Sequence, residues 1–294
     1  MYKTIEEYLD ALKEEMKGSD IALLQDAMAD AREHLTMALA SAREAKPDLD
    51  EAETLRKLIE EYGSPEETAS AYKEVERRTT PTLKQTVKHK SVLDRLFSVY
   101  VDPRTWDSLL FMFIAFVTGI IYFTWAVTGL SLSISFLILI IGIPFAILFL
   151  LSAQGLALLE GRLVEALLGV RMPRRPLFAQ PGLKWLDRLK TLLTDKHTWL
   201  SLLYMVLQMP LGIIYFLVMV TLLSFSVGAM ASPFTELIWK MAIVSFGANH
   251  VFQNYGSLIL LAVGGFITLT LTMHLARVIG WLHGRYAKLL LVSD

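Results

Sequence analysis

The six histidines are the residues of this sequence with the most versatile chemistry, since an imidazole can transfer protons and bind metals. They are His34, His89, His197, His250, His274 and His283. No pair has the spacing of zinc ligands beside a carboxylate. His274 and His283 could reach one haem or metal ion, but residues nine apart do not share one helix face. The chain also has no cysteine, which excludes disulfides, thiolate metal sites and cysteine nucleophiles. We therefore expect no metal and no cofactor.

Two carboxylates, Glu160 and Glu165, flank Arg162 and form the nearest approach to an acid–base pair. A salt-bridged helix face explains this spacing better, because residues three or four apart on a helix are neighbours. No phosphate-binding loop, nucleophile elbow or dinucleotide-binding motif occurs in a strand context, and no strand is expected. The sequence therefore predicts a protein that is not an enzyme.

The middle of the chain predicts a membrane protein. Residues 108–159 contain no charge over 52 positions, enough for two membrane helices of about 20 residues each. We expect spans at 109–127, 132–151, 201–225 and 257–276, with a hairpin turn at 128–133. Amphipathic stretches at 155–170 and 181–195 are typical of helices in the membrane interface, or of a docking face for a partner helix.

The net charge of −1 hides a strong asymmetry. Residues 1–78 hold 20 acidic and 11 basic side chains, whereas the rest holds 9 and 17. An acidic N-terminal part repels phosphate, so nucleic acid is not an expected partner. No cleavable signal peptide is visible, so the first membrane helix is expected to act as the targeting signal.

Basic residues flank the expected spans on one side. They are Lys84, Lys88, Lys90, Arg95 and Arg104 before the first span, Arg162, Arg171, Arg174, Arg175, Lys184, Arg188, Lys190 and Lys196 between the second and third, and Arg277, Arg285 and Lys288 after the fourth. By the positive-inside rule, both termini and the middle loop are cytoplasmic. We expect a multi-pass protein of a prokaryotic inner or plasma membrane.

Residues 101–123 and 194–216 resemble each other at an offset of 93. The offset aligns Asp102 with Asp195 and Trp106 with Trp199, and Glu160-Gly161-Arg162 resembles His283-Gly284-Arg285. The two hairpins are therefore expected to be a parallel repeat. Each Asp is expected to cap an interfacial helix, and each Trp to anchor it at headgroup level.

Polar residues at membrane depth or on the outer side are the remaining candidates. Gln154 and Gln208 are expected to bond to neighbouring helices, or to line a small cavity. The 226–256 segment is interpreted as a short helix lying on the bilayer, or as a sensory lid for an envelope or lipid ligand. The candidate lid residues are Glu236, Trp239, Asn249, His250, Gln253, Asn254 and Tyr255. The lid hypothesis predicts loss of response with normal folding for Trp239→Ala or Asn254→Ala.

The N-terminal part predicts a four-helix soluble domain, with helices at 4–17, 20–44, 50–62 and 64–78. The stretch GSPEE from 63 to 67 predicts a tight joint between its last two helices. Gly63 suits a left-handed helix stop, Ser64 an N-cap and Pro65 the first helical position, while Glu66 in the first turn suits the helix dipole.

Two family resemblances cover nearly the whole chain. The motif Tyr62-Gly63-Ser64-Pro65-Glu66-Glu67-Thr68-Ala69 resembles the HAAS-type signalling domain, a small helical module of bacterial and archaeal membrane proteins. The membrane part resembles the "putative sensor" family. The residues that carry this resemblance are Asp102-Pro103-Arg104-Thr105-Trp106, Thr128-Gly129-Leu130-Ser131 and Glu160-Gly161-Arg162 with Glu165-Ala166-Leu167-Leu168-Gly169. The resemblances imply signalling, often beside PadR-like transcription regulators.

The expected fold class is all-α, with a small soluble helical domain before a polytopic four-helix membrane domain. The expected domains are an acidic cytoplasmic domain (1–78), a basic linker (79–100) and a membrane domain (101–294). The membrane domain comprises a hairpin (101–170), an interfacial segment (171–195) and a second hairpin (196–294).

We expect a membrane sensor or regulatory adaptor that couples an envelope or lipid signal to a cytoplasmic protein, a transcription regulator or kinase. The partners expected are membrane lipids and that protein, with a homo-oligomer also open. The alternatives are the membrane subunit of a small transporter of ABC type and a bilayer scaffold. The absence of intramembrane ionisable residues and the parallel repeat argue against ion-driven transport.

Overall fold

The computed structural model describes residues 2–45, 50–79, 92–136, 142–174, 190, 192–239 and 255–292. These residues are almost entirely helical and contain no strand, which confirms the predicted all-α class. They form two compact units. The first is drawn from Met1–Gln85, Thr124–Met205 and Arg285–Asp294, and the second from Thr86–Phe123 and Val206–Gly284.

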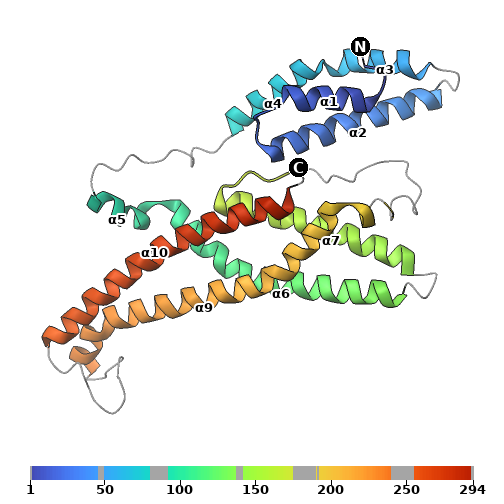
Figure 1. Cartoon of the computed structure of the whole chain (residues 1–294). Coiled ribbons are helices and arrows are strands. Elements are labelled where there is room, and N and C mark those ends of the chain that lie inside the picture. Colours follow the sequence, from blue (N-terminus) through green and yellow to red (C-terminus); the bar gives the residue numbers. More distant parts are fainter. Residues whose placement is uncertain are drawn as a thin grey trace. The chain divides into compact units, whose positions relative to one another are not determined.

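The N-terminal residues 2–79, here called the head, form a bundle of four helices (Figure 1). These are α1 (Ile5–Glu15), α2 (Ile21–Ala45), α3 (Glu51–Tyr62) and α4 (Pro65–Thr79), within two residues of the predicted bounds. The head core contains fully buried residues at helical spacing, among them Tyr8, Leu12 and Leu35. Apolar stripes on short charged helices thus bury one face each and leave the other faces in water.

Four long helices meet the length and hydropathy of membrane spans: α6 (Pro103–Phe136), α7 (Gly142–Leu168), α9 (Lys196–Trp239) and α10 (Tyr255–Leu291). The described part of the expected linker also contains a helix, α5 (Val92–Val101). At 1.5 Å per residue, a helix of 44 residues such as α9 is about 66 Å long, roughly twice the hydrocarbon thickness. Part of each long helix must therefore lie outside the bilayer core or cross it at a tilt.

The predicted hairpin turn at 128–133 is wrong, because α6 continues through it to Phe136. The Ser133 hydroxyl donates to the Gly129 carbonyl at 2.7 Å, and the Ser135 hydroxyl donates to the Ser131 carbonyl at 2.8 Å. Serines that bond back to their own helix keep their polar groups satisfied without leaving it. The second span accordingly begins at Gly142, not at 132, and the amphipathic stretch 155–170 largely belongs to it rather than to a separate interfacial helix.

The expected end of the third span at residue 225 is also wrong, because α9 continues past Pro233 to Trp239. A proline inside a helix frees the carbonyl four residues earlier, here that of Ala229. The Ser232 hydroxyl donates to that carbonyl at 2.8 Å. This local replacement lets the helix continue, as it does at prolines in many membrane helices. The first half of the 226–256 segment is therefore part of α9.

In the second unit, α6 and α9 pack closely and run antiparallel. A side chain added at Gly119 would lie 2.7 Å from the Gln208 carbonyl oxygen, and one added at Gly212 would clash with the Ala115 carbonyl. Further along the pair, the ring of Phe113 contacts the ring of Phe216. Glycine thus lets the two backbones touch. The antiparallel direction of α6 and α9 differs from the sequence expectation. Two hairpins that both enter the membrane from the cytoplasm would have parallel first helices.

Candidate functional site

The most highly charged cluster of the first unit lies where α7 ends. Gly169 adopts a φ of +68°, and its backbone N–H donates to the Glu165 carbonyl at 3.1 Å. A residue in this left-handed conformation ends a helix, and glycine adopts it without a steric penalty. The chain then runs without regular structure from 169 to 174. Arg171 and Arg174 therefore leave α7 and reach the head.

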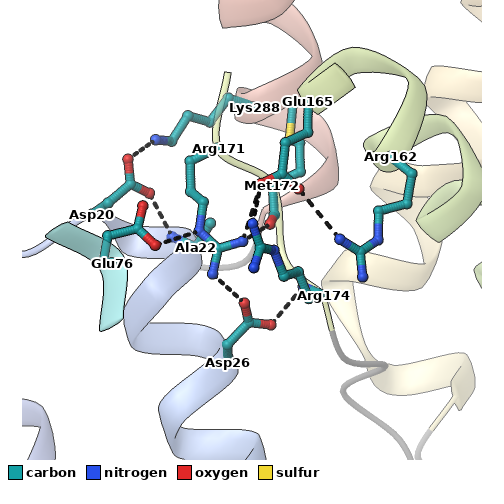
Figure 2. Close-up of polar contacts among 10 residues, drawn as sticks. All are labelled: Asp20, Ala22, Asp26, Glu76, Arg162, Glu165, Arg171, Met172, Arg174 and Lys288. Atoms are coloured by element: carbon teal, nitrogen blue, oxygen red, sulfur yellow. Dashed lines mark hydrogen bonds and ion pairs between the residues drawn. The ribbon is translucent and has the colours of Figure 1, made fainter. Parts of the chain in front are cut away.

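Arg171 is the centre of this cluster (Figure 2). Its side chain is only 8% exposed and forms ion pairs with three carboxylates. Asp26 of α2 lies at 2.8 Å, Glu76 of α4 at 3.3 Å and Glu165 of α7 at 3.3 Å. Two of these acids come from the head and one from the membrane part. A single buried guanidinium thus joins α2, α4 and α7.

Arg174 strengthens the same junction. Its backbone N–H donates to one oxygen of Asp26, while its guanidinium donates to Glu165 at 2.9 Å. This hydrogen bond to the Glu165 carboxylate is the main cause that raises the pKa of Arg174 above its usual range. Arg162 contacts Glu165 only at 3.5 Å and is half exposed, so it lies at the edge of the cluster.

A second ion pair joins the head to the end of α10. The Lys288 ammonium lies 2.6 Å from Asp20, and both side chains are about 30% exposed. The other oxygen of Asp20 accepts from the Ala22 N–H at 3.0 Å, which caps α2. The cap is a local contact, whereas the ion pair with α10 joins residues 268 positions apart.

The named ion pairs leave the junction balanced in charge. The head contributes Asp20, Asp26 and Glu76, whereas the membrane part contributes Glu165 and four cations. We call Arg162, Glu165, Arg171, Arg174 and Lys288 the basic patch. Removing one partner of a buried ion pair costs about 3–5 kcal/mol, because a charge is left uncompensated. The asymmetry between an acidic head and a basic body is the only sequence signal for this junction.

The joint at Gly63 has most of its predicted features. Ser64 and Glu67 form a reciprocal capping box, in which the Ser64 hydroxyl accepts from the Glu67 N–H at 3.2 Å and Glu67 accepts from the Ser64 N–H at 2.9 Å. Pro65 is the first residue of α4 and Glu66 lies exposed in its first turn. Gly63 has a φ of +113° but an extended ψ of 153°, so it is not the left-handed helical stop that was expected.

The hydroxyl of Tyr8 explains why the joint has this conformation. It donates to the Gly63 carbonyl at 3.0 Å and lies 3.1 Å from the Thr68 hydroxyl. The joint is therefore held against α1, and burial raises the pKa of the Tyr8 phenol.

The two predicted caps are confirmed, one in each unit. Asp102 accepts from the Arg104 N–H at 3.0 Å, and Asp195 accepts from the Thr198 N–H at 2.8 Å. Trp106 and Trp199 are both half exposed, and each indole N–H donates to the carbonyl six residues earlier, at 3.0 and 2.8 Å.

The partners of these caps also correspond. In the second unit, Arg277 of α10 donates to Thr105 at 3.0 Å and to Asp102 at 2.8 Å. In the first unit, Gln154 of α7 donates to Thr198 at 3.0 Å. Thr105 and Thr198 are 93 residues apart, the offset of the repeat. This correspondence supports the repeat, with Gln154 and Arg277 in equivalent places, and it agrees with a packing role for Gln154.

Two other candidates in the membrane helices, Gln208 and Glu160, are buried polar residues. Gln208 is fully buried, beside the close contact of α6 and α9. Glu160 is also buried and accepts a hydrogen bond from the Tyr204 hydroxyl at 2.9 Å. Glu165 contacts Arg162 at 3.5 Å, as expected for a salt-bridged helix face.

Four of the seven candidate lid residues lie outside the part of the chain that the structure describes. Glu236 is half-buried near the end of α9, Trp239 is the last residue of that helix, and Tyr255 begins α10 with 74% of its surface exposed. Asn249, His250, Gln253 and Asn254 lie outside the described residues. The lid stays a prediction.

The histidines that the structure describes each have a local partner. His197 bonds to the Leu291 carbonyl at 2.8 Å and His274 to the Leu96 carbonyl at 3.2 Å, while His283 lies 3.2 Å from the Tyr215 hydroxyl. His34 packs against the ring of Tyr62. Among the described residues, no group of three or more His, Asp or Glu side chains is arranged to hold a metal ion.

A comparison with protein families matches residues 111–291 to the model of a family described as "Putative sensor". This match spans more than half of the chain and includes α7, α9, α10 and most of α6. Neither a curated protein nor a solved structure matches the chain. With four helices that meet the criteria for membrane spans, the chain is a multi-pass membrane protein that belongs to this Sensor family.

Proposed function

We propose that this chain is a membrane sensor that acts as a regulatory adaptor. A change in the envelope or in the lipid bilayer shifts the membrane helices, and the head passes this change to a cytoplasmic protein. The observation that carries the proposal is the buried Arg171, which ties α2 and α4 of the head to the end of α7. Any movement of the end of α7 changes the ion pairs of the Arg171 guanidinium. A buried charge is costly to leave unpaired, so such a movement is coupled to the position of the head.

The head is suited to contact a protein when it leaves this junction. Its release would free Asp20, Asp26 and Glu76 from the cations that neutralise them. Three carboxylates on one head favour a partner with a basic surface, because complementary charge speeds association and selects partners. The two family resemblances imply signalling, which supports a transcription regulator or a kinase as that partner.

The orientation belongs to the same proposal. By the positive-inside rule, we propose that both termini and the head lie in the cytoplasm of a prokaryotic cell, because basic residues gather at the start of α6, at the end of α7, at the start of α9 and at the end of α10. The signal would then be received in the membrane or on its outer side, and the response given inside.

A pull-down from native membranes in mild detergent tests the adaptor role. We expect a soluble regulator to be retained by the full chain and lost when residues 1–79 are deleted. Arg171→Gln should increase retention, because it weakens docking of the head and leaves the acidic side chains of the head intact.

Arg162→Gln is the matched control, because it removes the same charge at the exposed edge of the patch. It should leave retention unchanged. Retention of the same partner without the head would contradict the proposal. Recovery of a transport ATPase alone would favour the transporter instead.

A further inference from the structure

The basic patch holds more positive charge than it can neutralise by itself. The patch has four cations and one carboxylate, Glu165, which pairs with Arg162, Arg171 and Arg174. The remaining neutralisation comes from Asp20, Asp26 and Glu76 of the head. When the head leaves, as the proposed function requires, the patch therefore carries a net charge of +3 unless another anion replaces the head.

The patch lies at the ends of two membrane helices. Arg162 and Glu165 lie in the last two turns of α7, Arg171 and Arg174 follow directly, and Lys288 lies in the last turn of α10. Both helices are long and apolar enough to cross a bilayer. Lys and Arg side chains at the end of a span lie at the depth of the lipid headgroups, where anionic lipids are the most abundant anions.

Asp26 shows which kind of anion this site accepts. One of its oxygens accepts from the Arg171 guanidinium at 2.8 Å, and the other accepts from the backbone N–H of Arg174. A guanidinium and a backbone N–H thus hold two oxygens of one anionic group. Proteins bind phosphate with the same kind of donors. The Asp26 carboxylate thus occupies the place of two phosphate oxygens.

We propose that the basic patch is a binding site for the phosphate of an anionic membrane lipid, and that this lipid and the head compete for it. Arg171 and the Arg174 backbone hold the phosphate, while Arg162 and Lys288 supply further positive charge. Binding of the lipid and docking of the head exclude each other, because both use the same donors. The lipid would therefore favour the released head.

The test is native mass spectrometry of the full chain in mild detergent, titrated with short-chain phosphatidylglycerol. Short-chain phosphatidylcholine, which carries no net charge, is the parallel titration. We expect phosphatidylglycerol to bind and Arg171→Gln to weaken its binding roughly tenfold, the usual loss for one hydrogen bond to a charged group. Arg171→Lys should weaken it less, because it keeps the charge but not the guanidinium geometry.

The matched control is Lys196→Gln, which removes one exposed positive charge at the start of α9, outside the patch. It should not change the affinity. Asp26→Asn should tighten lipid binding, because it weakens the competing head. A misfolded protein would not produce this gain, so the pair of opposite effects separates the site from a folding defect.

Three results would overturn the proposal. One is an equal loss in Arg171→Gln and Lys196→Gln, which would indicate general charge attraction. Another is no gain in Asp26→Asn. The third is displacement of the lipid by inorganic phosphate with the same dependence on Arg171, which would make the site one for soluble phosphate. None of these results affects the pull-down. The proposed function can therefore be correct, with a partner that depends on the head, even if the lipid site is not.

Discussion

At the scale of residues, short motifs were predicted well and long-range partners were not. The N-caps at Ser64, Asp102 and Asp195 depend on neighbours within three residues, so the local sequence is sufficient to predict them. The contact between Asp26 and Arg171 joins residues 145 positions apart. Its charges are visible in the sequence, but only packing decides which acid meets which base.

The capping box gives a first prediction. Ser64→Ala should destabilise the start of α4 by about 1 kcal/mol, the usual cost of losing an N-cap. Hydrogen-exchange mass spectrometry of the full chain measures this as lost protection in the first turns of α4. Ser70→Ala removes an exposed hydroxyl from the same helix and should have little effect. Equal losses in both variants would contradict the cap.

The same contact predicts a dependence on pH. Hydrogen bonds from the backbone and side chain of Ser64 lower the pKa of Glu67 below its ordinary value of 4.5. A carboxyl whose pKa is lowered by folding stabilises the fold above its ordinary pKa, and that stabilisation is lost as the pH falls through the lowered value. Protection of α4, corrected for intrinsic exchange, should therefore fall below about pH 4.5 in the wild type. Glu67→Gln should remove this dependence, and an unchanged profile would refute the assignment.

At the scale of elements, the existence of each long helix was predictable, but its ends were not. The sequence interpretation placed a turn at 128–133 and the end of the third span at residue 225, because spans of about 20 residues suffice to cross a bilayer. The hydroxyls of Ser133 and Ser232 instead bond to helix carbonyls. In an apolar environment, leaving a helix exposes backbone groups to lipid, so local repair is favoured over a turn.

The contact between α6 and α9 gives a prediction at this scale. Gly119→Ala should lower the stability of the membrane part by about 1–3 kcal/mol, because the new methyl group would clash with backbone atoms of Gln208 that cannot turn aside. Thermal unfolding of the detergent-purified chain, followed by tryptophan fluorescence, measures the loss.

Gly264→Ala is the control for this change. It adds the same methyl group within α10 at a position where no other atom lies within 4 Å. We expect it to leave the melting temperature unchanged or slightly raised, since alanine favours a helix more than glycine does. A loss as large as that of Gly119→Ala would show that the close contact is not the cause.

At the scale of the whole molecule, the all-α class and the presence of four candidate spans were predicted correctly. The direction of the second hairpin differs between the charge pattern and the packing of the helices. The charge pattern places the end of α6 and the start of α10 on the same, outer side. The antiparallel contact of α6 and α9 places these two ends on opposite sides if both helices cross the bilayer. Periodicity and charge describe each helix separately, so neither reveals how two helices pack.

Cysteine labelling tests this topology, and the absence of native cysteine makes it simple. We expect Glu14→Cys and Leu289→Cys to react with a membrane-impermeant maleimide only from the cytoplasmic side. Phe136→Cys and Tyr255→Cys should react only from the opposite side. Labelling of Phe136→Cys and Tyr255→Cys from different sides would contradict the charge-based topology and support the antiparallel one.

Gly169 has a consequence for genetics. A methyl group at this position would meet no other atom within 4 Å, so Gly169→Ala changes no contact and no charge. It does oppose the φ of +68°, at a cost of about 1–2 kcal/mol for an L-residue. That cost falls only on the state in which the chain turns at the end of α7 to reach the head. A screen for constitutively signalling alleles should therefore recover substitutions of Gly169 as well as of Arg171, including some that leave every charge in place.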